Sequence, residues 1–190
     1  MTPSTDYDKL DHRIDTHFDE EVRFLQELIR VPTDTPPGHN APHAERMAEL
    51  LKDFGFEAEK HAVTQAEVEA RGLQSITNLI VRRNYAKDGA GLTIALNAHG
   101  DVVPPGDGWT TDPYGGEIRN GSIYGRASAV SKSDFASLPG VIYGAGPRSV
   151  LESHAKRADE RLALVDLRGA TKVIARTLLD LLSVPKASAS

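Results

Sequence analysis

Apolar residues at three- and four-residue spacing mark two helices in the first third of the chain. The first helix is expected over 15–30, because Pro32 cannot continue it. The second helix is expected over 41–54, with Gly55 as its C-terminal stop. The apolar positions that define the two buried faces are Phe18, Val22, Leu25, Leu28, Ile29, Ala44, Met47, Leu50 and Leu51.

Shorter apolar runs in the middle of the chain predict β-strands. Residues 56–63 alternate like an edge strand, and strand-like runs follow at 75–83 and 91–99. The run at 91–99, GLTIALNAH, is apolar enough to be buried on both faces of a sheet. Two short strands are expected at 117–119 and 122–124, at the end of a long loop rich in Gly, Pro, Asp and Asn.

The last third begins with a helix that is cut short. SKSDFASLPG carries helix-start residues and then Leu-Pro-Gly, so the helix should end within two turns. A strand at 141–144 and a closing helix over 165–182 follow. This order of elements predicts an α/β domain of three layers, with a mostly parallel mixed sheet flanked by helices.

Length and composition agree with one domain. A chain of 190 residues with 39% hydrophobic content is long enough for one ordinary core. We expect that domain over 15–183, between a polar N-terminal tail at 1–14 and a C-terminal tail at 184–190.

The charge pattern and the absence of cysteine narrow the possible partners. The formal net charge is -5 and the basic residues are scattered, so neither nucleic acid nor a membrane is an expected partner. The polar N-terminus has no apolar signal region, and no stretch approaches the ~20 apolar residues of a membrane span, so a cytoplasmic location is expected. Without cysteine, the strong metal ligands are His, Asp and Glu.

His99 and Asp101 are the first candidates for chemistry, because they stand at the end of the expected strand 91–99. A histidine there can bind a metal through one ring nitrogen, while a carboxylate two residues later orients the ring. On this spacing alone, a structural histidine satisfied by its neighbouring carboxylate is the favoured interpretation. We expect His99 to project from the end of a buried strand, with Asp101 within hydrogen-bond reach of its ring.

A longer string of residues changes that balance. LNAHGDVVPPGDGWTTDPYGGEIRNGSIYGRASAVSK resembles the signature of the M20 family of metallopeptidases and deacylases, in which His-x-Asp-x-Val precedes Trp, Asp-Pro-aromatic and Tyr-Gly-Arg-Gly. ELIRVPTDTPPG and AERMAELLKDFGFEAE resemble the family's first two helices, and residues 139–182 resemble its last catalytic-domain segment. The resemblance implies an incomplete zinc-peptidase-like catalytic domain.

The resemblance also implies a zinc site, with cobalt or another divalent metal as alternatives. His99 would bind one metal, Asp101 would orient its imidazole as the catalytic carboxylate, and His154 would bind the second metal. The family's bridging carboxylate falls at Val130, which cannot coordinate zinc, and Asp134 is a candidate replacement one helical turn later. Taken from the residues alone, Asp134 is favoured as an acid at a helix N-terminus and His154 as a surface-loop histidine.

Parts of the family pattern are missing. In the family a pair of glutamates, a further acidic ligand and a lid domain lie between these segments, whereas here Ser137 is followed at once by Leu138. We therefore expect an internal deletion near 137–138. The acidic residues that flank His154 are expected to be solvated loop charges: Glu152, Asp159 and Glu160.

Three hypotheses follow for function. The leading one is a zinc-dependent metallopeptidase or amidohydrolase of the M20 type, acting on small peptides or N-acyl amino acids, with weak or no activity. The runner-up is a non-catalytic binding or scaffold domain with at most one weakly held metal. The third is a poorly folding chain whose exposed sheet edges favour self-association. If the matching segments pack as in the family, His99 and His154 should face one cleft, with strand 141–143 beside the strand that ends at His99.

Overall fold

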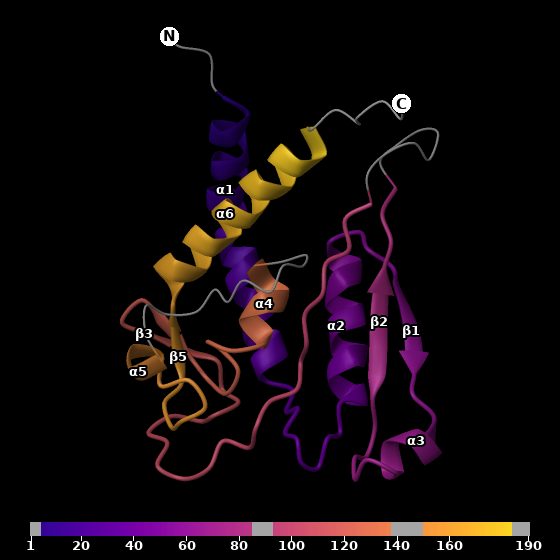
Figure 1. Cartoon of the computed structure of the whole chain (residues 1–190). Coiled ribbons are helices and arrows are strands. Elements are labelled where there is room, and N and C mark those ends of the chain that lie inside the picture. The colour runs from indigo at the N-terminus through magenta and orange to yellow at the C-terminus, as the bar shows by residue number, and fades with distance from the viewer. Residues whose placement is uncertain (1–4, 85–92, 138–149, 184–190) are drawn as a thin grey trace.

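The computed structural model describes residues 5–84, 93–137 and 150–183. Within these ranges the chain forms both helices and short strands (Figure 1). The elements in chain order are α1 (Asp6–Ile29), α2 (Ala41–Asp53), β1 (Ala58–Ala62), α3 (Gln65–Glu69), β2 (Thr77–Val81), β3 (Glu117–Arg119), β4 (Ser122–Tyr124), α4 (Lys132–Ser137), α5 (Val150–Ser153), β5 (Arg161–Ala163) and α6 (Leu164–Ser183).

The first helix is longer than its apolar pattern predicts. α1 begins at Asp6, because Thr5 and Asp8 form a capping box in which each side chain accepts the other residue's backbone N–H. Residues 6–14 therefore belong to the helix, and the predicted start at Asp15 is wrong. The added turns are mostly polar, with Leu10 and Ile14 half-buried at four-residue spacing before Phe18, and the cap and the contacts with α6 hold them in the helix.

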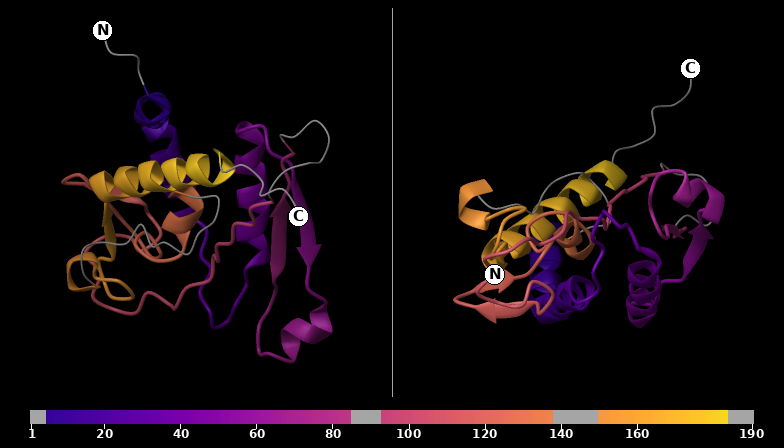
Figure 2. Two further views of the ribbon diagram at one scale, coloured as in Figure 1. Left: turned by 45° about the horizontal axis from the view of Figure 1, so that its top comes forward. Right: turned by 90° about the horizontal axis from the view of Figure 1, so that it is seen from below.

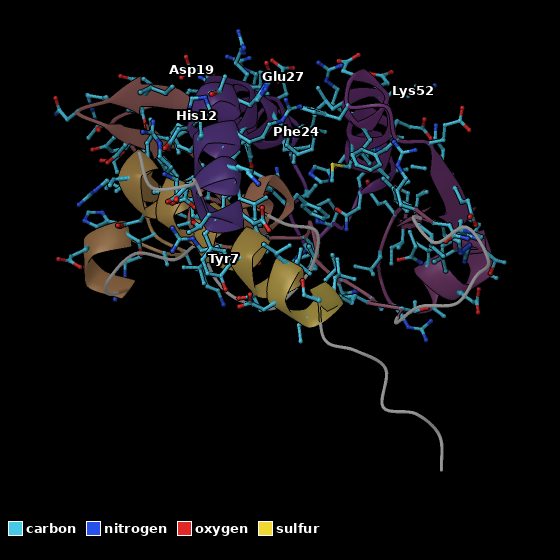
Figure 3. All side chains as sticks on the ribbon, turned by 90° about the horizontal axis from the view of Figure 1, so that it is seen from above. Tyr7, His12, Asp19, Phe24, Glu27 and Lys52 are labelled. Atoms are coloured by element: carbon cyan, nitrogen blue, oxygen red, sulfur yellow. The ribbon has the colours of Figure 1, made fainter. Side chains whose placement is uncertain are left out.

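α6 runs across α1, and the two helices enclose the larger part of the core (Figures 1 and 2). Their outer ends are joined by charged pairs, with Arg176 bound to Asp11 at 2.6 and 3.0 Å and Lys172 to Asp15 at 2.7 Å. Tyr7 lies beside α6, as Figure 3 shows, and its hydroxyl donates to Asp180. The buried side chains beneath are Phe18, Val22, Leu25, Ile29, Ile123, Ala129, Leu162, Leu167 and Ala170. The predicted closing helix is confirmed.

A second group of elements lies to one side of α1. α2 packs against the hairpin of β1 and β2, and α3 follows β1 at the far end of that hairpin (Figure 1). The predicted helix over 41–54 and the two strands are confirmed. Phe24 lies on the side of α1 that faces α2, and its ring meets Phe54 edge to face at 5.7 Å (Figure 3). The side chains buried at this junction are Phe24, Leu28, Met47 and Leu50.

The predicted mostly parallel sheet is wrong for the described residues. Their strands form two small antiparallel sheets, one of β1 and β2 and one ordered β3-β4-β5. The expected strand 91–99 forms no ladder over 93–99, although its side chains alternate between exposed and half-buried as a strand's would. A buried strand needs hydrogen-bonding neighbours on both sides, and an apolar pattern cannot supply them.

The remaining elements are short helices and strands. The short helix α4 and the strands β3 and β4 lie where the sequence predicts them. The predicted strand at 141–144 lies outside the described residues. α3, α5 and β5 are each five residues or fewer, too short for a periodic signal. No helix in the described ranges is both long and apolar enough to cross a membrane.

Candidate functional site

The His99–Asp101 pair sits on a turn that is tied to the segment after α1. The backbone N–H of Val102 donates to the carbonyl of Thr33 at 3.2 Å, and the N–H of Thr35 donates to the carbonyl of Val102 at 2.7 Å. These two bonds form a parallel bridge between Asp34 and Val102. Residues 99–102 are thus held in place by hydrogen bonds to 33–35 rather than by a sheet.

The pair has the predicted contact but not the predicted surroundings. Nδ1 of His99 lies 3.0 Å from Oδ1 of Asp101, so the expected hydrogen-bond reach is confirmed. The side chains are 61% and 53% exposed, so the expectation that His99 projects from a buried strand is wrong. The carboxylate only accepts, so in the neutral imidazole this contact favours the proton on Nδ1 and leaves the lone pair of Nε2 for a ligand.

A buried ion pair organises the loop that carries Val130. Arg126 donates to Glu160 at 2.6 Å, and both side chains are 1% exposed. The other carboxylate oxygen of Glu160 accepts the backbone N–H of Ala129 at 3.1 Å. Burial raises the pKa of the Glu160 carboxyl, while Arg126 and the backbone donors oppose that shift. The prediction that Glu160 is a solvated loop charge is therefore wrong, because Arg126 draws it into the interior.

Lys132 is a second buried cation. It is fully buried at the start of α4, and its Nζ donates to the carbonyl of Val31 at 2.6 Å. Burial lowers its pKa to about 7, and the carboxylates of Asp34 and Glu160 act in the opposite direction. Asp34 also accepts a hydrogen bond from the hydroxyl of Tyr114, and burial together with that bond raises the pKa of Tyr114. Lys132 thus joins α4 to the end of α1.

His154 and Asp134 lie on other segments. His154 is half-buried in the turn after α5, with a positive φ of 53°, and its Nδ1 lies 3.0 Å from the carbonyl of Ala158. Asp134 is half-buried in the first turn of α4. Across the described residues, no group of three or more His, Asp or Glu side chains is placed to hold a metal ion. His99 and Asp101 are brought together, whereas the metal roles of His154 and Asp134 remain predictions.

Sequence reasoning missed most of the buried polar network. Arg126 and Lys132 belong to the matching motif, but nothing in their spacing shows that both are buried. The sequence patterns also do not identify His43, which is 5% exposed in the first turn of α2 and whose pKa burial lowers to about 3. A charged or polar residue inside an apolar helix face would have been the available signal for His43.

Part of the chain is similar in sequence to known enzymes. No protein-family model matches the chain. The chain is 37% identical over 141 residues to the succinyl-diaminopimelate desuccinylase of Nitrobacter hamburgensis, which covers 73% of this chain and 32% of that enzyme. It is 36% identical over 117 residues to the Wolinella succinogenes desuccinylase, covering 62% and 28% respectively.

The fold is shared with a solved structure as well. Human carnosine dipeptidase 1 aligns with a TM-score of 0.51 and 22% identity, over 71% of this chain and 30% of that one. The chain spans about a third or less of the length of these relatives. Together, the ordered sequence match and the common fold show that this chain is partially similar to the M20 family enzymes and corresponds to part of one of them.

Proposed function

We propose that this chain is an M20-related amide-hydrolase domain that binds one divalent metal ion weakly through His99 and has little or no turnover. The single observation that carries the proposal is the 3.0 Å contact between His99 and Asp101 on an anchored turn. That contact orients the ring through Nδ1 on a side chain that is 61% exposed, which suits one metal ligand with its orienting carboxylate.

The residues do not fit the paired zinc centre that the family resemblance implies. Catalytic zinc is normally held by three protein ligands, and a pair of ions also needs a shared anion between them. The described residues offer no such group of three, and Val130 stands where the bridging carboxylate is expected. We therefore derive no catalytic step through a metal pair.

A general base is the second requirement of amide hydrolysis. Glu160 is committed to Arg126 in the interior and has no access to a water near His99. Asp159 accepts the N–H and the hydroxyl of Thr110 at 2.8 and 2.9 Å, which occupies both its oxygens. Neither of these two carboxylates is therefore placed to act as the base, which supports the proposal of weak or absent turnover.

The names of the relatives suggest which substrates to test. They are desuccinylases of succinyl-diaminopimelate and a carnosine dipeptidase, so small N-acyl amino acids and dipeptides form the substrate class of the proposal. Zinc is the first metal to test and cobalt the second, because histidine nitrogen suits both ions.

The test measures zinc stoichiometry, zinc affinity and hydrolysis of succinyl-diaminopimelate and carnosine on one pure sample. We expect one weakly bound zinc ion, lost in His99→Ala and weakened in Asp101→Asn. His61→Ala is the matched control, because His61 is also about half exposed and also faces a carboxylate two residues away, Glu59 at 3.3 Å. Equal zinc loss in both alanine variants would refute a specific site at His99.

The non-catalytic binding or scaffold domain is the second candidate. The half-buried side chain of Val130, inside the loop that Arg126 and Glu160 hold, favours it. On this alternative, zinc binding would still depend on His99, but no amide substrate would turn over at any zinc concentration. Measurable hydrolysis that disappears in His99→Ala would exclude it.

A further inference from the structure

Gly100 lies between His99 and Asp101. The ring of His43 lies where a side chain at position 100 would project. A Cβ atom added at Gly100 would lie 2.9 Å from Cε1 and 3.0 Å from Nδ1 of His43, nearer than such atoms pack. The same Cβ would lie 3.4 Å from the ring of Phe135, an ordinary contact. The φ angle of Gly100 is outside the left-handed region, so His43, not backbone strain, excludes a larger residue here.

The ring of His43 is buried and uncharged. It projects from the first turn of α2, is 5% exposed, and packs against Phe135 with ring centroids 5.8 Å apart. Burial lowers its pKa to about 3, so the ring is neutral at physiological pH. Its Nε2 has no hydrogen-bond partner among the described residues. His43 therefore acts on the turn through steric contact with Gly100.

Two hydroxyl groups hold the same turn from other sides. The hydroxyl of Thr33, which is 1% exposed, donates to the carbonyl of Gly100 at 2.5 Å. The hydroxyl of Ser131, which is 2% exposed, donates to the carbonyl of Asp101 at 3.2 Å. Buried hydrogen bonds of this kind fix the direction of the peptide groups they reach.

We infer that His43 and Thr33 are positioning residues, which clamp Gly100 so that the ring of His99 and the carboxylate of Asp101 keep the orientation a metal ligand needs. The inference rests on the proposed function, because the purpose of the clamp is to present Nε2 of His99. Neither His43 nor Thr33 touches the metal in this scheme. Their effect passes through the backbone of the turn.

The test reads the proton position on His99 directly. Long-range ¹H–¹⁵N spectra at pH 8 distinguish the Nδ1–H tautomer, which the Asp101 bond favours, from the Nε2–H tautomer. Gly100→Ala should reduce the Nδ1–H population, because the new methyl group and the His43 ring need the same space. The double variant His43→Ala/Gly100→Ala removes that ring and should restore it. Gly169→Ala is the control, since an added Cβ there meets nothing within 4 Å.

Thr33 is tested by one substitution that removes the hydroxyl at similar size and one that keeps it. Thr33→Val removes the donor to Gly100 and should shift the tautomer in the same direction, whereas Thr33→Ser keeps the hydroxyl and should not. In the variants that shift, zinc affinity should fall by about tenfold, the usual effect of losing a group that orients a ligand. Equal tautomer populations in wild type, Gly100→Ala and Thr33→Val would overturn the inference.

The remaining outcomes also decide the question. If the double variant does not recover, His43 is not the obstacle at Gly100 and its assigned role is wrong. If Gly100→Ala unfolds while the double variant folds, the clash is confirmed through stability. If wild type binds no zinc but the tautomers shift as described, the proposed function fails and the clamp stands. The two proposals are therefore separable.

Discussion

The buried pair of Arg126 and Glu160 offers the sharpest test of how this fold is stabilised. Arg126→Met would leave the Glu160 carboxylate in the interior without its cation, at a position where both side chains are 1% exposed. Removing one partner of a buried pair typically costs about 3–5 kcal/mol, because the remaining charge stays desolvated. Domains of this kind are stable by only ~5–15 kcal/mol, so the loss should be large.

The double substitution separates the charge from the packing. Arg126→Met/Glu160→Gln removes both charges of the pair, and the amide oxygen can still accept the N–H of Ala129, which Glu160 accepts at 3.1 Å. We expect the double variant to be destabilised by clearly less than the sum of the two single variants, with a coupling of about 1–3 kcal/mol. We therefore expect that removing one partner lowers the free energy of unfolding strongly, whereas replacing both partners lowers it much less.

The assay is urea unfolding followed by circular dichroism and tryptophan fluorescence. Trp109 is the single tryptophan, and the guanidinium carbon of Arg126 lies 5.4 Å from its ring centroid, so its emission reports locally on the pair. Arg82→Met is the control, because the Arg82–Glu59 pair is exposed and should contribute under about 1 kcal/mol. Single-variant losses below about 1 kcal/mol, or strict additivity in the double variant, would refute the reasoning.

Three further predictions concern other parts of the chain. Burial raises the pKa of Glu21 to about 7, so wild-type stability should fall as pH rises from about 4.5 to about 7. In urea titrations at several pH values, Glu21→Gln should remove most of that fall, which is on the order of 1 kcal/mol for a half-buried group. Thr5→Ala breaks the α1 capping box and should cost about 1 kcal/mol, whereas Thr5→Ser should cost little, as thermal unfolding will show. Val130→Asp should leave zinc affinity unchanged in calorimetry, because the described residues hold no group of three or more His, Asp or Glu side chains placed for a metal ion, and tighter binding would instead reveal an assembled cleft.

Much of the local structure could be predicted from the sequence. α2, α6, β3 and β4 follow from apolar spacing and turn residues, because these signals act within a few residues of one another. The hydrogen bond between His99 and Asp101 could be predicted for the same reason, since the two residues are two positions apart. The family similarity was also visible in the ordered motif that contains them.

Long-range pairing was decided only by the tertiary structure. The apolar run at 93–99 has the composition of a buried strand, yet strand formation depends on partners that its own residues do not encode. Residues 6–14 are helical partly because of the local Thr5–Asp8 cap, and partly because Asp11 and Asp15 meet Arg176 and Lys172 on a helix more than 150 residues away. Local pattern cannot report a contact of that separation.

The candidate site divides in the same way. The sequence by itself determined which residues carry ligand chemistry, because histidine and carboxylate types fix what a side chain can bind. Only the tertiary structure decided that Glu160 turns inward to Arg126, that His43 closes the space at Gly100, and that the described ligand types do not gather into a group of three. The physical reason is that burial and direction depend on the packing of distant segments, whereas chemical type belongs to each residue alone.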